Sequence, residues 1–210
     1  MRPNFRLSKI VIITRAFVIG LIIGIVARAW MRWVSTDPEF SWSGSIFIVG
    51  VFTIFFTAQS IVLVLRSSTS SRAKSRVIRA GGLIFTLPLF LGAGGIMLPS
   101  VAVASIALWG GIQKKRGRIF LLALSVIVPL IISKDVIRDF GWTFATLGRI
   151  LLFLLIYASV IFATSPTVSP FKSTKEERIK ILSRGKKIMI SLGTLVAVAL
   201  FMLYSGLLGG

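Results

Sequence analysis

Long apolar blocks separated by short polar and basic segments dominate the pattern of the chain. Most blocks are close to the ~20 residues that a helix needs to cross the ~30 Å hydrocarbon core of a bilayer. None alternates apolar and polar residues in the way that leaves one face of a soluble element in water. The pattern predicts an all-α, polytopic transmembrane helical bundle forming one domain over residues 1–210. The seven expected spans are residues 10–33, 45–65, 80–97, 101–113, 119–133, 150–164 and 188–208.

The apolar block from residue 80 to residue 113 can be threaded in two ways. It is long for one span, and it contains several glycines and the dipeptide Pro99–Ser100. Its second arm, residues 101–113, would reach only about 20 Å as a helix. We expect two spans here and seven in all; the alternative is six spans plus a re-entrant hairpin.

The distribution of basic residues favours a block that returns to its starting side. Cytoplasmic loops of membrane proteins are enriched in Lys and Arg. If residues 80–113 return to the side on which they begin, 20 basic residues lie inside and 5 outside. If they cross the membrane once, 12 lie inside and 13 outside. The N-terminus is therefore expected in the cytoplasm and the C-terminus outside. Cleavage of the first block as a signal peptide near Ala27–Arg28–Ala29 is disfavoured, because Arg15 interrupts its apolar stretch.

The amino-acid composition excludes many kinds of catalytic and metal-binding site. The 210 residues are 55% hydrophobic and 15% charged, and they include no cysteine and no histidine. Disulfides, thiolate nucleophiles, imidazole acid–base groups and most zinc and haem ligand sets are thereby excluded. No cofactor and no metal site is expected.

The formal net charge is +19, but the basic residues lie in short clusters between the apolar blocks. This placement is typical of cytoplasmic loops and argues against a nucleic-acid partner. The expected partners are the lipid bilayer and its anionic headgroups, to which each base near the surface contributes about 1 kcal/mol.

Two polar residues are expected inside the membrane. Arg15 lies within the first block, and Gln59 lies about two turns before Arg66 in the second, at a comparable depth. Together they are a candidate site for an anion or a lipid headgroup. The alternative is that Arg15 extends to the cytoplasmic interface while Gln59 forms an interhelical hydrogen bond.

The outer connector between the first two spans is rich in charged and aromatic residues. Arg28 and Arg32 are spaced i, i+4 on one helix face. Asp37 and Glu39 lie in the following segment, where Pro38 is expected to turn the chain back toward the two arginines. Such a hairpin could gate a pathway or bind a partner. The alternative is an interfacial tryptophan belt with salt bridges that fix how the two helices meet.

Paired carboxylates occur once more, at Asp135 and Asp139 in the expected connector over residues 134–149. Such a pair can act in acid–base chemistry or bind a divalent cation. The neighbouring basic residues favour a solvated loop instead.

A GxxxG pattern formed by Gly20 and Gly24 predicts close helix packing, either within the bundle or in a homo- or hetero-oligomer.

The segment RAWMRWVSTDPEFSWSGSIFIVG, residues 28–50, resembles a segment of uncharacterised bacterial multi-pass membrane proteins. The resemblance covers about a tenth of the chain. It implies a location in the bacterial plasma (inner) membrane, and it implies no activity and no site residue.

All six acidic residues fall in expected connectors: Asp37, Glu39, Asp135, Asp139, Glu176 and Glu177. Proton-coupled transporters and intramembrane proteases place carboxylates within the membrane, so these classes are disfavoured. The sequence favours a non-enzymatic scaffold or accessory subunit of a membrane complex. The alternatives are a small transporter or channel for an anion or lipid, and, last, an enzyme using the outer carboxylates.

Overall fold

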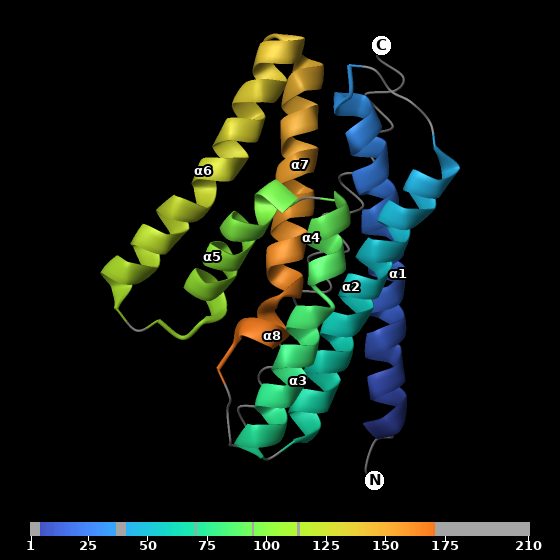
Figure 1. Cartoon of the computed structure of the whole chain (residues 1–210), viewed down its shortest axis with the longest axis vertical. Helices are drawn as coiled ribbons and strands as arrows, with labels where there is room; N and C mark the ends of the chain where they lie inside the picture. Colours follow the sequence, from blue (N-terminus) through green and yellow to red (C-terminus); the bar gives the residue numbers. More distant parts are fainter. Residues whose placement is uncertain (1–4, 37–40, 70, 94, 113, 171–210) are drawn as a thin grey trace.

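The computed structural model describes residues 5–36, 41–69, 71–93, 95–112 and 114–170. Within these ranges the chain is helical and contains no strand (Figure 1). The helices in chain order are α1 (Phe5–Val34), α2 (Trp42–Ser68), α3 (Arg72–Ile84), α4 (Leu87–Ala93), the short 3₁₀ helix η1 (Gly95–Met97), α5 (Leu98–Trp109), α6 (Lys115–Phe140), α7 (Phe144–Ala163) and α8 (Ser165–Val168).

Five helical segments are long and apolar enough to cross a membrane: Lys9–Val34, Trp42–Ser68, Arg72–Gly92, Lys115–Phe140 and Phe144–Val168. These segments are compatible with a membrane protein, and the predicted all-helical fold is confirmed for the described residues. The expected count of about seven spans is not confirmed. The stretch Gly95–Trp109 is a shorter apolar helix, and the expected span 188–208 lies outside the described residues.

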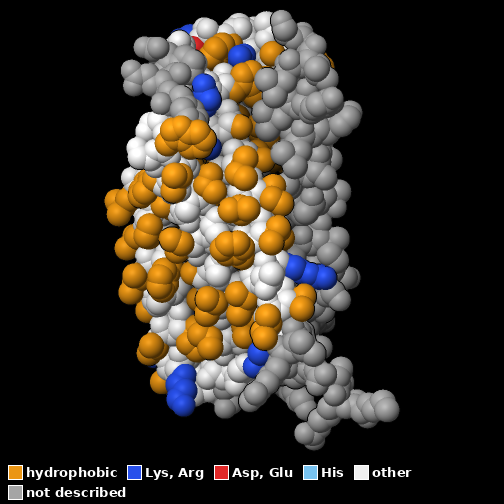
Figure 2. Space-filling model, turned by 90° about the vertical axis from the view of Figure 1, so that its right-hand side faces the viewer, with side chains coloured by type: hydrophobic (Ala, Val, Ile, Leu, Met, Phe, Trp, Pro, Cys, Tyr) orange, Lys and Arg blue, Asp and Glu red, His pale blue; other side chains and the backbone are white. Residues whose placement is uncertain are grey.

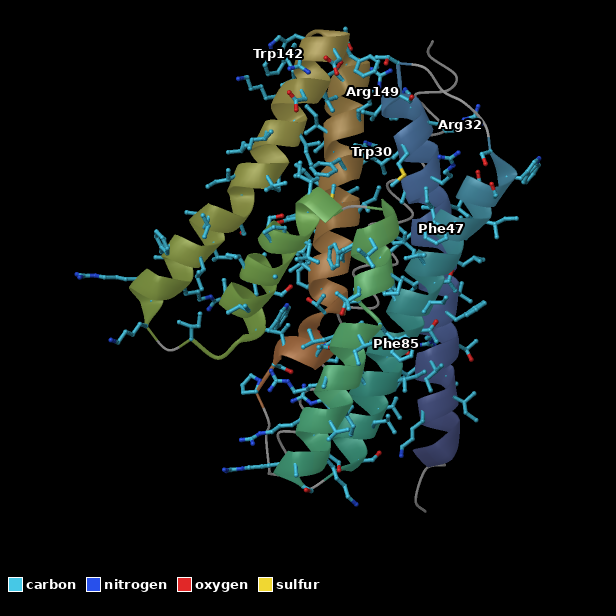
Figure 3. The ribbon with its side chains drawn as sticks, in the orientation of Figure 1. Trp30, Arg32, Phe47, Phe85, Trp142 and Arg149 are labelled. Carbon is cyan, nitrogen blue, oxygen red and sulfur yellow. The ribbon has the colours of Figure 1, made fainter. Side chains whose placement is uncertain are left out.

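The helices run alternately up and down along one long axis (Figure 1). Helix α1 rises, α2 descends, α3 and α4 rise again, and α5 turns back downward before α6 rises and α7 descends. We call the end at which α1 and α3 begin the basic end, because it carries Lys9, Arg66 and Lys74. We call the opposite end, where Trp142 and Arg149 lie (Figure 3), the tryptophan end.

Hydrophobic side chains cover the middle of the face shown in Figure 2, and Lys and Arg side chains lie mostly toward its two ends. This is the distribution that a helix bundle surrounded by lipid requires, since a charged side chain is costly away from the interfaces.

Two helices extend further than the apolar pattern predicted. Ser71 caps α3 by accepting from the backbone N–H of Lys74, so the basic stretch expected as part of a connector forms the first turns of a helix. Helix α6 continues to Phe140, and the expected connector over residues 134–149 is reduced to the turn between Phe140 and Phe144. Gly141 ends α6 with a φ of +67°, a conformation that glycine adopts readily.

The break between α3 and α4 has a local cause. Pro88 has no backbone N–H, so it cannot continue the helical hydrogen bonds of the preceding turn. The Thr86 hydroxyl lies 2.9 Å from the carbonyl oxygen of Gly82 and 2.7 Å from that of Leu83. Its single proton can be donated to either of these two carbonyls at the end of α3.

Helices α1 and α2 pack closely, backbone against backbone. A Cβ atom added to Gly20 would lie 2.9 Å from the Thr53 Cα, and one added to Gly24 would lie 2.8 Å from the Val49 Cα. The GxxxG pattern therefore serves packing within the chain. The main apolar core continues from this interface to α4, α5 and α7 through buried residues that include Phe52, Phe55, Phe56, Leu89, Phe90, Val101 and Val160.

Candidate functional site

Arg15 and Gln59, the two polar residues expected to form a site inside the membrane, do not contact one another through a hydrogen bond. Arg15 is exposed on α1, whereas the Gln59 side chain is only 2% exposed. Gln59 Nε2 donates to the carbonyl of Gly82 at 3.3 Å, and its Oε1 accepts from the Thr167 hydroxyl at 2.5 Å. No hydrogen bond between Arg15 and Gln59 is present among the described residues. Gln59 thus joins α2 to α3 and α8, as the interhelical alternative predicted.

Gly82 makes this junction possible. A Cβ atom at this position would lie 2.5 Å from Thr167 Oγ1 and 2.9 Å from Val62 Cγ2. Only a glycine lets the α3 backbone approach closely enough to accept from Gln59. The junction of α2, α3 and α8 therefore depends on a glycine at position 82.

Two arginines hold the last described residues at the same end. Arg66 donates from its Nη atoms to the carbonyls of Pro166, Ser169 and Pro170, the last two at 3.0 Å. Arg79 donates to the carbonyls of Thr167 at 2.7 Å and Val168 at 3.2 Å. We call these two guanidinium groups and their five carbonyls the carbonyl clasp.

The clasp has a simple physical basis. The last carbonyls of a helix lack partners within that helix and carry partial negative charge, which a guanidinium neutralises. Sequence reasoning counted Arg66 and Arg79 only as loop charges. The spacing of about 100 residues between them and α8 left no local signal.

A reciprocal contact joins α1 to α7 at the tryptophan end (Figure 3). The Trp30 indole N–H donates to the carbonyl of Arg149 at 2.8 Å, and Arg149 Nε donates to the carbonyl of Trp33 at 3.1 Å. The Arg149 guanidinium carbon also lies 5.0 Å from the Trp33 ring centre and 4.0 Å from that of Phe140. Sequence reasoning had counted Arg149 only in the charge balance.

The remaining outer candidates have local partners or lie outside the described residues. Arg28 Nε donates to the Ser45 hydroxyl at 3.0 Å, so it links α1 to the start of α2. Arg32 is exposed. Asp37 and Glu39 lie outside the described residues, and the expected salt bridges to them stay a prediction.

The carboxylates of Asp135 and Asp139 lie in the last turns of α6, not in a loop. Both pair with Arg138, at 3.2 Å and 3.1 Å. Exposed pairs of this kind contribute at most about 1 kcal/mol. Over the described ranges, no three His, Cys, Asp or Glu side chains come together as a metal-binding group.

Pro129 interrupts the hydrogen bonding of α6. It has no N–H to donate to the carbonyl of Ser125, four residues earlier. The Tyr157 hydroxyl from α7 donates to that carbonyl at 3.0 Å instead. A neighbouring helix thus supplies the hydrogen-bond donor that the proline removes, as proline in a membrane helix requires.

A central cavity of about 40 Å³ lies between α1, α2, α4, α5 and α7. Its lining is apolar and largely aromatic: Ala27, Trp30, Met31, Phe52, Leu89, Phe90, Met97, Val101, Phe153, Ile156, Tyr157 and Val160. The polar atoms of Trp30 and Tyr157 already have partners. A water needs two to four polar partners, so this cavity is dry.

A second, larger hollow of about 400 Å³ lies on the surface between α1, α2 and α3. We call it the α2–α3 groove. It is lined by Phe17, Thr53, Ile54, Thr57, Ala58, Ile61, Val62, Leu65, Ile78, Gly81, Gly82 and Phe85.

Comparison of the chain with protein-family models, with curated proteins and with solved structures finds no match. The resemblance suggested for residues 28–50 therefore has no support from these comparisons, and the function rests on the geometry alone.

Proposed function

We propose that this multi-pass helical protein is a non-enzymatic scaffold or accessory subunit of a membrane complex. The observation that carries the proposal is the dry, internally satisfied centre of the bundle. The Trp109 indole N–H is the one buried side-chain polar group among the described residues that lacks a hydrogen-bond partner. The other buried polar side chains of the described residues have partners within their own helix or on a neighbouring one, which supports a structural role for them.

The exposed surface of α6 supports the same proposal. Within its most apolar stretch 17% of residues are buried in the bundle, against 56% in α2. Phe120, Leu124, Ile127 and Ile131 are all exposed and follow one face of α6 at i, i+4, i+7 and i+11. We propose this face, the α6 stripe, as the contact for a partner helix.

We further propose that the basic end faces the cytoplasm of a bacterial inner membrane. The abundance of Lys and Arg at the start of α3 and of α6 supports this orientation. In this orientation residues 72–109 form a re-entrant hairpin, because α5 spans only 12 residues, or about 18 Å. The C-terminus would then lie outside.

The scaffold proposal is tested by affinity capture of the tagged full chain from its native membranes in mild detergent. We expect a membrane partner in near-stoichiometric amount. The double variant Leu124→Ala/Ile127→Ala should reduce its recovery, whereas Ile25→Ala on the exposed face of α1 should not. Equal recovery from wild type and both variants would refute the α6 contact, and no stoichiometric partner in any sample would refute the scaffold.

A transporter or channel for an anion or lipid is the second candidate. It needs a wet route from Arg15 to the hairpin near Met97, whereas the central cavity is apolar and does not reach Arg15. Reconstitution into liposomes separates the two: flux of chloride or phosphate, or exchange of labelled lipid between leaflets, above that of empty liposomes would favour transport.

An enzyme using Asp135 or Asp139 with Arg28 or Arg32 ranks last, because Arg138 pairs with both carboxylates. Alanine at all four positions should still complement a deletion strain if the scaffold proposal holds.

A further inference from the structure

The carbonyl clasp brings two guanidinium groups to one segment of the chain. Arg66 and Arg79 donate to the consecutive carbonyls of Pro166 and Thr167. All the hydrogen-bond acceptors of the two side chains are carbonyl or hydroxyl oxygens, which carry no formal charge. Both arginines are half-buried. The clasp is therefore a pair of positive charges without a counter-charge of its own.

No carboxylate of the described residues offsets these charges. The two acidic residues that the structure describes, Asp135 and Asp139, lie in the last turns of α6, and both pair with Arg138. Trp142, which marks the tryptophan end, follows three residues after Asp139. These carboxylates thus lie toward the end of the bundle opposite the clasp, and an anion at the basic end would meet an excess of positive charge.

Arg79 retains donors that the clasp does not use. A guanidinium group carries five N–H bonds in an arrangement that suits an oxyanion. Arg79 donates one from Nε to Thr167 and one from Nη2 to Val168. The remaining three, including both on Nη1, have no acceptor among the described residues. The clasp therefore fixes the position of a guanidinium group and leaves part of it available to a ligand.

The side chains beside Arg79 change from basic to apolar along one side of α3. Four residues spaced i, i+4, i+7 and i+11 form this side, which we call the α3 face: Arg72, Arg76, Arg79 and Leu83. Arg72 and Arg76 are exposed, and Leu83 is 56% exposed. Because α3 begins at the basic end (Figure 1), the arginines lie toward the membrane interface and Leu83 lies deeper.

A lipid with an anionic head matches this order of side chains. Residues three apart on a helix are neighbours with Cβ atoms about 5–6 Å apart, so Arg76 and Arg79 can both donate to one phosphate group. Leu83 lies about one turn further into the membrane than Arg79, where an acyl chain joined to that phosphate would extend. Arg72 adds a third positive charge at the interface.

We propose that the α3 face binds one anionic phospholipid of the leaflet at the basic end, with its phosphate between Arg76 and Arg79 and an acyl chain along Leu83. The carbonyl clasp positions Arg79 for this contact. The inference does not depend on the scaffold proposal, since a lipid binds this face whether or not a partner helix covers α6.

Native mass spectrometry of the full chain in mild detergent tests the proposal. Phosphatidylglycerol and phosphatidylcholine with identical acyl chains are added at equal concentration. We expect wild type to retain one phosphatidylglycerol and to retain phosphatidylcholine at least about fivefold less, the factor that one base contributes at a membrane surface. Equal retention of the two lipids by wild type would overturn the proposal.

Removal of one arginine locates the phosphate. Arg76 is exposed and takes no part in the clasp, so Arg76→Gln should fold as wild type does and lower phosphatidylglycerol retention about fivefold. The matched control is Lys74→Gln, which removes an equal charge from another side of α3, two residues away, and should have little effect. Equal losses in the two variants would show that only the total charge matters, and the assignment to the α3 face would be wrong.

The apolar part of the face has its own pair of variants. Leu83→Gln should lower the retention of both lipids at least about twofold, because both lose the same contact with an acyl chain. Val77→Gln, at an α3 residue that is 72% exposed on another side, should not. Unchanged retention in Leu83→Gln would contradict the proposal.

Two other occupants give distinct results in the same experiment. If inorganic phosphate at the concentration of the lipid displaces phosphatidylglycerol, the site belongs to a free anion. If wild type is a dimer that Arg76→Gln dissociates, the α3 face belongs to a second copy of the chain. Either result would overturn the proposal.

Discussion

The hydroxyl of Tyr157 in α7 donates to the carbonyl of Ser125 in α6 at 3.0 Å, the carbonyl that Pro129 leaves without a helical donor. A side chain on one helix thus completes the backbone of another. In lipid an unpaired carbonyl has no water to bind, so the contact stabilises α6 at the turn that contains Pro129.

Removing the Tyr157 hydroxyl should therefore destabilise the bundle. We expect Tyr157→Phe to lower the free energy of unfolding by about 1 kcal/mol, measured by thermal unfolding in detergent. In a Pro129→Ala background, Ala at 129 supplies an N–H for Ser125, and the effect of Tyr157→Phe should largely disappear. Ser159→Ala is the control, because that hydroxyl donates only to Leu155 of its own helix. Equal effects of Tyr157→Phe in both backgrounds would contradict this account.

The contact between Arg149 and the tryptophans should depend on the shape of the guanidinium group as well as its charge. Arg149 both donates to the carbonyl of Trp33 and lies over two aromatic rings. We expect Arg149→Ala to cost about 1–3 kcal/mol and Arg149→Lys to recover less than half of the loss, since lysine lacks the planar fork. Arg138→Ala, which removes only exposed ion pairs, should change stability by less than about 1 kcal/mol. Full recovery by lysine would show that charge alone matters.

The glycines of α1 should tolerate no larger side chain. Gly20→Leu would place atoms against the backbone of Thr53, and separating α1 from α2 should cost about 1–3 kcal/mol or more. Gly50→Leu adds the same side chain in open space and should be nearly neutral. Both variants should keep the oligomeric state of wild type in size-exclusion chromatography with light scattering. A change of oligomeric state in Gly20→Leu alone would indicate that the glycines also serve an interface between copies.

Labelling of single cysteines tests the orientation of the bundle, because the chain contains no native cysteine. Cysteines replacing Ser70 and Gly117 should resist an impermeant reagent applied from outside, and those replacing Ser41 and Trp142 should react. Ser133, which the apolar pattern would place at a span end, lies within α6 and is unsuitable. Reaction at position 117 from outside would mean that residues 72–109 cross the membrane once and would invert every later segment.

Apolar patterning predicted the helices well where the apolar blocks are long, as in α1 and α2. It placed helix ends less well, because a helix can continue past the hydrocarbon core. The basic first turns of α3 and the charged last turns of α6 both extend beyond the expected spans.

The candidate site was predicted only in part. Gln59 was recognised as a polar residue inside the bundle, since its type is unusual in an apolar block. Its partners could not be predicted, because Thr167 lies 108 residues further along the chain and Gly82 contributes only a backbone carbonyl. Arg149 was missed for the same reason, because its hydrogen bonds are to Trp30 and Trp33, which are more than 100 residues away in the sequence.

The downward turn of α5 has a consequence for the surrounding bilayer. Figure 1 shows α5 between α6 and α7. A helix of 12 residues covers about 18 Å, so the acyl chains beside α5 meet a helix much shorter than the ~30 Å hydrocarbon core, and those beyond its end meet its connector to α6 instead.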